Sequence, residues 1–210
     1  MLINELAKAV HENAVAHGWW DDEREAPEII ALIHSEWSEA LEEARAGRPL
    51  AYIIANTDVY RDPEELVVPR NAEGKYITPW GKEYHGKPEG VAVELIDGCI
   101  RILDLMGKMK VDTQDDDTDT PSEIESLYEE NFSSEVKDTP LPHTVAYLHL
   151  LTSSALISGA VEGDINPWKL LQAMALALSW VRNQGLDPLA ILLEKHEFNK
   201  SRPYKHGKKF

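Results

Sequence analysis

The chain has 210 residues, of which 43% are hydrophobic, so it is long enough for one domain with a substantial core. Its formal net charge of −16 argues against general binding of nucleic acid through the phosphate backbone. No apolar run approaches the roughly 20 residues that cross a bilayer, so we expect no membrane association. The single cysteine, Cys99, excludes an intrachain disulfide framework. Together with an N-terminus that lacks a signal-peptide pattern, it favours a reducing, cytoplasmic location.

The first part of the chain is predicted to form two helices and an insertion. Apolar residues at helical spacing predict a helix over 3–16 and another from near Pro27 to Arg45, which Gly47 and Pro49 end. Residues 49–86 are irregular and rich in proline and glycine, and we interpret them as an insertion. Two short strand-like pieces, 51–54 and 75–78, suggest a small hairpin within it.

The second part is again helical. Pro88 at a first helical position predicts a helix that continues to about Met106. A polar acidic loop, about 108–122, follows, and apolar-rich segments predict helices over 144–161, 167–184 and 188–200. Asn166, just before Pro167, is typical of a helix cap. The sequence therefore predicts one all-α domain over 1–210, a helical bundle with an irregular insertion.

Two pairs of acidic residues lie within helical patterns, each with a spacing of three: Glu36 with Glu39, and Glu94 with Asp97. Residues three apart on a helix share a face, and apolar residues flank both pairs. Four carboxylates on the inner side of a bundle would repel one another unless a cation neutralised them. Oxygen ligands suit hard divalent ions, so the pattern predicts a Mg²⁺ site, with Mn²⁺ as the other candidate.

Simpler interpretations of the same acids stay open. Either pair alone is typical of a solvated helix face, and Arg101, one turn after Asp97, could form a salt bridge with that buried carboxylate. A di-iron bundle site is less consistent with the chain, because no histidine has a glutamate three positions before it. Without such histidine ligands, a metal site made only of carboxylate oxygens is the preferred interpretation.

The C-terminal segment concentrates positive charge in an otherwise acidic chain. Residues 195–210 contain six basic side chains and one acidic one. Such a segment can attract a small polyanion, although a basic tail without a ligand would have the same composition.

Three stretches in this order, HSEWSEA, KPEGVAVELIDGCIRILDL and EKHEFNKSRPYKHGKK, resemble the MazG-like all-α nucleoside triphosphate pyrophosphohydrolases. The similarity covers about half of the chain. It implies Mg²⁺-dependent hydrolysis of an NTP or dNTP to the monophosphate and pyrophosphate, and a homodimer or higher homo-oligomer. It also implies that the metal ligands and catalytic carboxylates are Glu36, Glu39, Glu94 and Asp97.

The same resemblance implies a substrate site in the C-terminal segment. The phosphate and sugar contacts would be Lys195, Asn199 and Arg202, with Tyr204 and Lys208 as weaker candidates. We also expect Trp20, in the turn between the first two helices, to stack on the base; a core or subunit-interface role is the alternative. The long gap between the acidic pairs departs from compact members of the family. A non-catalytic helical module that senses nucleotides or docks a protein is the competing function.

Overall fold

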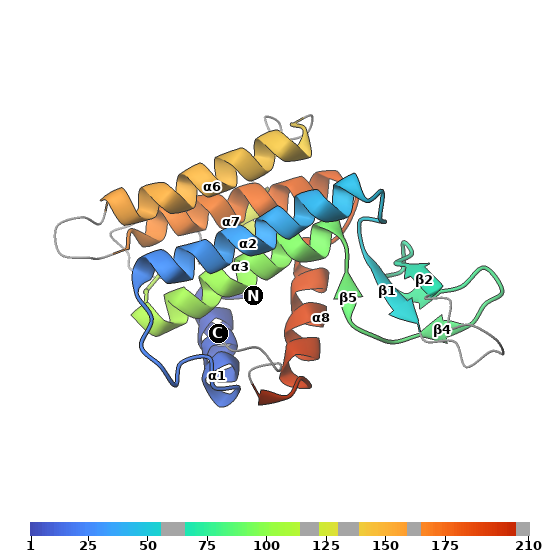
Figure 1. Cartoon of the computed structure of the whole chain (residues 1–210), viewed down its shortest axis with the longest axis horizontal. Coiled ribbons are helices and arrows are strands. Elements are labelled where there is room, and N and C mark those ends of the chain that lie inside the picture. Colours follow the sequence, from blue (N-terminus) through green and yellow to red (C-terminus); the bar gives the residue numbers. More distant parts are fainter. Residues whose placement is uncertain (56–65, 114–121, 130–138, 159–164, 205–210) are drawn as a thin grey trace.

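The computed structural model describes residues 1–55, 66–113, 122–129, 139–158 and 165–204, and these residues are mainly helical (Figure 1). A small β region lies at one end of the helices. The described helices are α1 (Ile3–Ala16), α2 (Ala26–Arg45), α3 (Val91–Met109), α4 (Ser126–Glu129), α6 (Leu141–Ser158), α7 (Pro167–Asn183) and α8 (Pro188–Lys200).

Most helix predictions agree with the structure to within a few residues. The first helix spans 3–16 as predicted, and the last spans 188–200. The helix predicted over 144–161 begins at Leu141 and is described to Ser158, so the last predicted turn lies outside the described residues. Asn166 caps α7 as expected, because its side chain accepts a hydrogen bond from the Trp168 backbone N–H at 3.0 Å. The short α4 was not predicted.

Helix α3 is the central element of the fold. It contacts α1, α2, α7 and α8, while α6 packs against α7 and α2. Figure 1 shows α2, α3, α6 and α7 running along a common direction, with α1 and α8 on one side of them. Because α3 has helical neighbours on several sides, most of its residues are buried. No helix in the described part of the chain is both long and apolar enough to cross a membrane.

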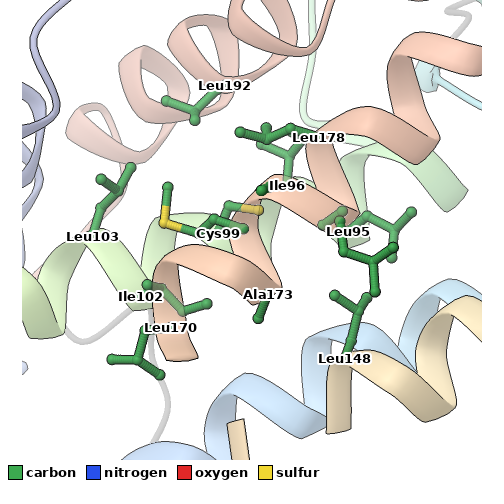
Figure 2. Close-up of a cluster of buried hydrophobic side chains, with 14 of the residues drawn as sticks. Leu95, Ile96, Cys99, Ile102, Leu103, Leu148, Leu170, Ala173, Leu178 and Leu192 are labelled. Atoms are coloured by element: carbon green, nitrogen blue, oxygen red, sulfur yellow. The ribbon is translucent and has the colours of Figure 1, made fainter. Parts of the chain in front are cut away.

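The main hydrophobic core includes the region where α3 meets α7 and α8, and side chains of α6 join it (Figure 2). Leu95 and Ile102 of α3, Leu178 of α7 and Leu148 of α6 have almost no solvent exposure. Cys99 lies in the same core, where burial raises the pKa of its thiol. It is therefore a packing residue and an unreactive one.

A close approach between α2 and α3 depends on Gly98. A Cβ atom at this position would lie 2.0 Å from the indole Nε1 of Trp37 on α2. The same indole N–H donates a hydrogen bond to the backbone carbonyl of Leu95 at 3.2 Å. The large Trp37 ring thus packs directly against the α3 backbone, and this contact sets the spacing of the two helices that carry the acidic pairs.

The insertion contains strands, so the fold is not entirely helical. Strand β1 (Tyr52–Ala55) pairs antiparallel with both β2 (Leu66–Pro69) and β5 (Pro88–Glu89), and β3 (Tyr76–Ile77) pairs with β4 (Glu83–Tyr84). The predicted hairpin between 51–54 and 75–78 is wrong, because these two pieces belong to different sheets. The strands enclose a small apolar cluster of their own, in which Ile53, Val68 and Tyr76 are buried.

The prediction that Pro88 begins a helix is also wrong. Pro88 lies in β5 opposite Ile53, and α3 starts three residues later at Val91. Gly90 makes the turn between strand and helix with φ of +111°, a conformation that favours glycine. Its backbone is also so close to the carbonyl oxygen of Pro49, 2.6 Å from an added Cβ, that a side chain would not fit.

At the other end, α3 runs to Met109, and Lys110 follows it in the left-handed region with φ of +54°. The acidic loop predicted over about 108–122 thus begins inside the helix. Residues 114–121 of that loop lie outside the described residues.

Candidate metal and substrate site

The two acidic pairs lie on neighbouring helices, Glu36 and Glu39 on α2 and Glu94 and Asp97 on α3, and all four line one cavity of about 220 Å³. One carboxylate oxygen from each of Glu36, Glu39 and Glu94 lies within 4.8 Å of the other two. The side chains of Glu36 and Glu94 are buried, and Glu39 is exposed. These three carboxylates, which we call the acidic triad, are close enough to share one cation.

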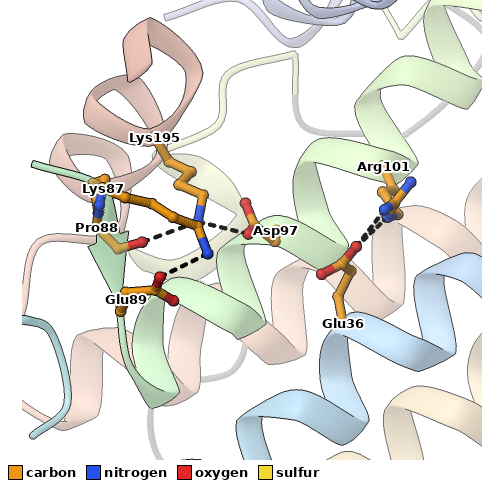
Figure 3. Close-up of polar contacts among 7 residues, drawn as sticks. All are labelled: Glu36, Lys87, Pro88, Glu89, Asp97, Arg101 and Lys195. Carbon is orange, nitrogen blue, oxygen red and sulfur yellow. Dashed lines mark hydrogen bonds and ion pairs between the residues drawn. The ribbon is translucent and has the colours of Figure 1, made fainter. Parts of the chain in front are cut away.

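Asp97 lies beside the triad but has a partner in the protein (Figure 3). The ammonium of Lys195 on α8 is 2.8 Å from Asp97 Oδ2 and donates a second hydrogen bond, 3.1 Å, to the carbonyl of Pro88. Lys195 is only 1% exposed. The sequence resemblance assigned Lys195 to a phosphate contact. The structure places its ammonium against Asp97, and Lys195 is not among the residues that line the cavity, so the phosphate contact stays a prediction.

Glu36 has a protein cation as well. Arg101, one turn after Asp97 on α3, donates through Nε and Nη2 to Glu36 Oε1 (Figure 3). The sequence suggested a salt bridge between Arg101 and Asp97. This prediction is wrong, because Arg101 pairs with Glu36. The physical reason is that the ammonium of Lys195 already neutralises the Asp97 carboxylate, while Glu36 projects from α2 toward Arg101.

Among the acids of the site, Glu36 and Asp97 each contact a positively charged side chain, whereas the buried Glu94 has no such ion pair among the described residues. Burial and the neighbouring Asp97 carboxylate raise the pKa of Glu94 to about 8. No hydrogen bond to its carboxylate occurs among the described residues, and the side chain is 4% exposed. Burial also raises the pKa of Asp97, although Lys195 opposes this effect. A buried carboxylate in this position requires a proton or a cation.

Two of the predicted substrate residues on the C-terminal side line the same cavity. Asn199 on α8 places its Oδ1 in a buried position without a hydrogen-bond partner among the described atoms. Arg202 follows α8 and its guanidinium interacts electrostatically with Asp97 and Glu36. An amide and a guanidinium in the same cavity as several carboxylates can contact a ligand that carries both hydroxyl and anionic groups.

The other predicted substrate residues are placed differently. Tyr204 is 60% exposed and does not line the cavity; its hydroxyl donates a hydrogen bond to Asp21. Lys208 lies outside the described residues. Trp20 lines the cavity, and its indole N–H donates to Asp104 Oδ1 at 2.9 Å. The ammonium of Lys108 lies 5.1 Å from the centroid of the Trp20 ring, so base stacking on Trp20 stays a prediction.

Several cavity residues were not predicted from the sequence. Asp104 continues the row of Asp97 and Arg101 along one face of α3, and the spacing of three and four residues would have indicated it. His196 on α8 is 5% exposed, and neither ring nitrogen has a hydrogen-bond partner among the described residues. Burial lowers its pKa, which favours the neutral imidazole at neutral pH. No sequence pattern indicated this residue.

Comparisons with known proteins do not extend this description. No protein-family model matches the chain, and neither the curated proteins nor the solved structures contain a significant match. A functional conclusion therefore depends on the geometry and chemistry of the cavity.

Proposed function

We propose that this protein is a Mg²⁺-dependent nucleoside triphosphate pyrophosphohydrolase, a helical enzyme of the MazG-like type that cleaves an NTP or dNTP to the monophosphate and pyrophosphate. The observation that carries the proposal is the acidic triad, in which oxygens of Glu36, Glu39 and Glu94 from two helices lie within 4.8 Å of one another. The triad shares its cavity with Arg202 and Asn199, which suit the anionic and hydroxyl groups of a nucleotide.

The residues of the triad fit a hard divalent ion. All of the donors are carboxylate oxygens, which Mg²⁺ and Mn²⁺ accept readily, and no protein cation neutralises Glu94 by direct contact among the described residues. When bound, Mg²⁺ would neutralise phosphate charge and lower the pKa of a coordinated water. We assign Glu36, Glu39 and Glu94 to the ion, with Asp97 as a further predicted ligand.

The protein residues would position the triphosphate and accept a proton. Arg202 suits bidentate contact with phosphate oxygens, and Asn199 offers an oxygen and an amide N–H to the sugar. Of the two α2 carboxylates, Glu39 is the better candidate for the base that takes the proton of the attacking water. Glu36 is already paired with Arg101, whereas Glu39 is exposed to the solvent from which the attacking water comes.

Pyrophosphate release from a panel of NTPs and dNTPs, with and without Mg²⁺, tests this proposal. We expect turnover only with the metal, and a loss of more than ~100-fold in Glu39→Gln, since even residues behind metal ligands cost 10–100-fold. Glu42→Gln is the matched control, because Glu42 is an exposed acid one turn further along α2 and does not line the cavity. Equal activity of both variants would contradict the site assignment.

A second candidate function is a non-catalytic nucleotide-sensing or protein-docking module. The observation that favours it is that Lys195 and Arg101 already neutralise Asp97 and Glu36 within the protein. Saturable nucleotide binding with no pyrophosphate release from any nucleotide, with Mg²⁺ or Mn²⁺, would support this module over the enzyme. The homo-oligomer and the cytoplasmic location stay predictions; size-exclusion chromatography with light scattering tests the first.

A further inference from the structure

The cavity extends beyond the acidic triad along one face of α3. Asp97, Arg101 and Asp104 all line it, and they follow one another at the spacing of a single helix face. Asp104 lies seven positions after Asp97, which corresponds to roughly 10 Å along the helix axis. This length is comparable to a nucleoside. The inference that follows rests on the proposed function, because phosphates held at the triad leave the Asp104 end of the cavity for the base.

Asp104 is a half-buried carboxylate with a fixed orientation. Its Oδ1 accepts the indole N–H of Trp20 at 2.9 Å and lies 2.7 Å from Nδ1 of His11. Trp20 also lines the cavity, and its ring meets the His11 ring edge-on with centroids 5.4 Å apart. Both hydrogen bonds use the same oxygen. Within the described part of the chain, no hydrogen bond reaches the other oxygen, Oδ2.

An acceptor in this position discriminates among ligands by the groups that they present. His11 and Trp20 both contact Oδ1, so the lone pairs of Oδ2 remain to accept a hydrogen bond from a donor of the ligand. An exocyclic amino group supplies N–H donors. A carbonyl oxygen at the same place would instead oppose one acceptor with another, which leaves both without a partner.

We propose that Asp104 is a specificity-determining residue that selects nucleobases with an exocyclic amino group over bases with a carbonyl oxygen at the corresponding position. Adenine and cytosine are therefore preferred over hypoxanthine and uracil. The carboxylate accepts the amino N–H through Oδ2, while His11 and Trp20 hold it in place through Oδ1.

Isothermal titration calorimetry with deoxynucleoside monophosphates tests this inference in the full-length protein without requiring turnover. The pairs dCMP with dUMP and dAMP with dIMP differ in the amino group and the attached ring proton but keep the size of the base. We expect the amino-bearing member of each pair to bind roughly 10–100-fold more tightly, as for a hydrogen bond to a charged group. Equal affinities, or tighter binding of dUMP and dIMP, would overturn the inference.

The variant Asp104→Asn keeps the shape of the side chain and lets an amide oxygen still accept from Trp20. We expect it to reduce the ratio between dCMP and dUMP to about threefold or less, because an amide can also donate to a carbonyl. The control is Glu12→Gln, which removes one acid of an exposed pair with Lys8 on α1 and does not touch the cavity. An unchanged ratio in a folded Asp104→Asn protein would also refute the role of Asp104.

The failure of this inference is distinct from that of the proposed function. Wild-type protein that releases pyrophosphate but binds the paired monophosphates equally would refute the selection by Asp104 and leave the enzyme intact. Wild-type protein that discriminates dCMP from dUMP but releases no pyrophosphate would refute the enzyme and retain the base-selecting site.

Discussion

The helix pair α2–α3 and the helix pair α6–α7 lie side by side in the same bundle, yet they differ sharply in charge. The first pair carries the acidic triad and Asp97, whereas the sequences of α6 and α7 contain no aspartate or glutamate. Helix α7 faces the apolar side of α3, while the cavity lies on the other side. The comparison suggests a division of roles, in which α6–α7 supplies the packing that keeps α3 in place and α2–α3 supplies the chemistry.

A large-to-small substitution in α6–α7, the helix pair without acidic residues, should lower the stability of the fold and leave turnover nearly unchanged. Leu178 on α7 is fully buried against α3, so Leu178→Ala is expected to lower the free energy of unfolding by roughly 2–5 kcal/mol. The turnover number per folded molecule should stay within about twofold of wild type, because Leu178 does not line the cavity. Denaturant unfolding and pyrophosphate release, measured well below the melting temperature, give the two values. A large fall in turnover of the folded variant would contradict the division of roles.

In metal-free protein, the pH dependence of the free energy of unfolding should show how much the charged Glu94 carboxylate beside Asp97 destabilises the fold. The pKa of Glu94 is raised from 4.5 to about 8, so the folded state binds this proton more tightly than the unfolded state does. The resulting stabilisation is complete below pH 4.5 and disappears as the pH rises through 8. Because one pKa unit corresponds to about 1.4 kcal/mol, we expect a decline on the order of 2–4 kcal/mol across this range.

Thermal unfolding in EDTA at several pH values measures this decline, and Glu94→Gln is the diagnostic variant. The neutral amide cannot titrate, so the variant should lose most of the decline and be the more stable protein at pH 8. If wild type and Glu94→Gln show the same pH dependence, Glu94 is not the group responsible.

The contact between α2 and α3 can be tested at Gly98. An alanine in a helix is ordinarily more stable than glycine by ~0.5–1 kcal/mol. At Gly98, however, the added methyl would overlap the Trp37 indole, so Gly98→Ala is expected to destabilise the fold by roughly 1–3 kcal/mol. It should also lower turnover, because the two halves of the triad would move apart. Denaturant unfolding and pyrophosphate release of the variant measure both effects.

A double-mutant cycle with Trp37→Phe separates the overlap from other causes. The smaller ring leaves space for the methyl group, so Gly98→Ala should cost less in the Trp37→Phe background than in wild type. Additive effects of the two substitutions would show that the close approach of α2 and α3 does not explain the result.

The sequence predicted the helices well because their periodicity is local information. The apolar pattern of 3–16 and the proline-to-glycine limits of the last helix depend only on neighbouring residues. The spacing of Glu36 with Glu39 and of Glu94 with Asp97 similarly predicted two acidic helix faces, and the structure places them on one cavity. A shared face within one helix can be read from a sequence.

Pairing between distant segments could not be read in the same way. Pro88 has the local features of a helix start, but pairing with Ile53 makes it part of a strand. The partners of Arg101 and Lys195 were missed for the same reason, because each contact joins two elements that are distant along the chain. Nothing in the local sequence distinguishes a lysine that binds phosphate from a lysine that neutralises a buried aspartate.

The position of α8 has a consequence for the strand insertion. Arg70, next to β2, donates to Glu194 at 3.3 Å, and the adjacent Lys195 joins the carbonyl of Pro88 in β5 to Asp97. Two consecutive side chains of α8 thus contact the strand region, and one of them, Lys195, also contacts a carboxylate of the acidic cavity. Shortening the insertion would remove Arg70 and the strand residue Ile53 that pairs with Pro88, and with them the support that places Lys195 beside Asp97. A shortened protein could therefore retain every acidic residue and still lose the alignment of its carboxylates.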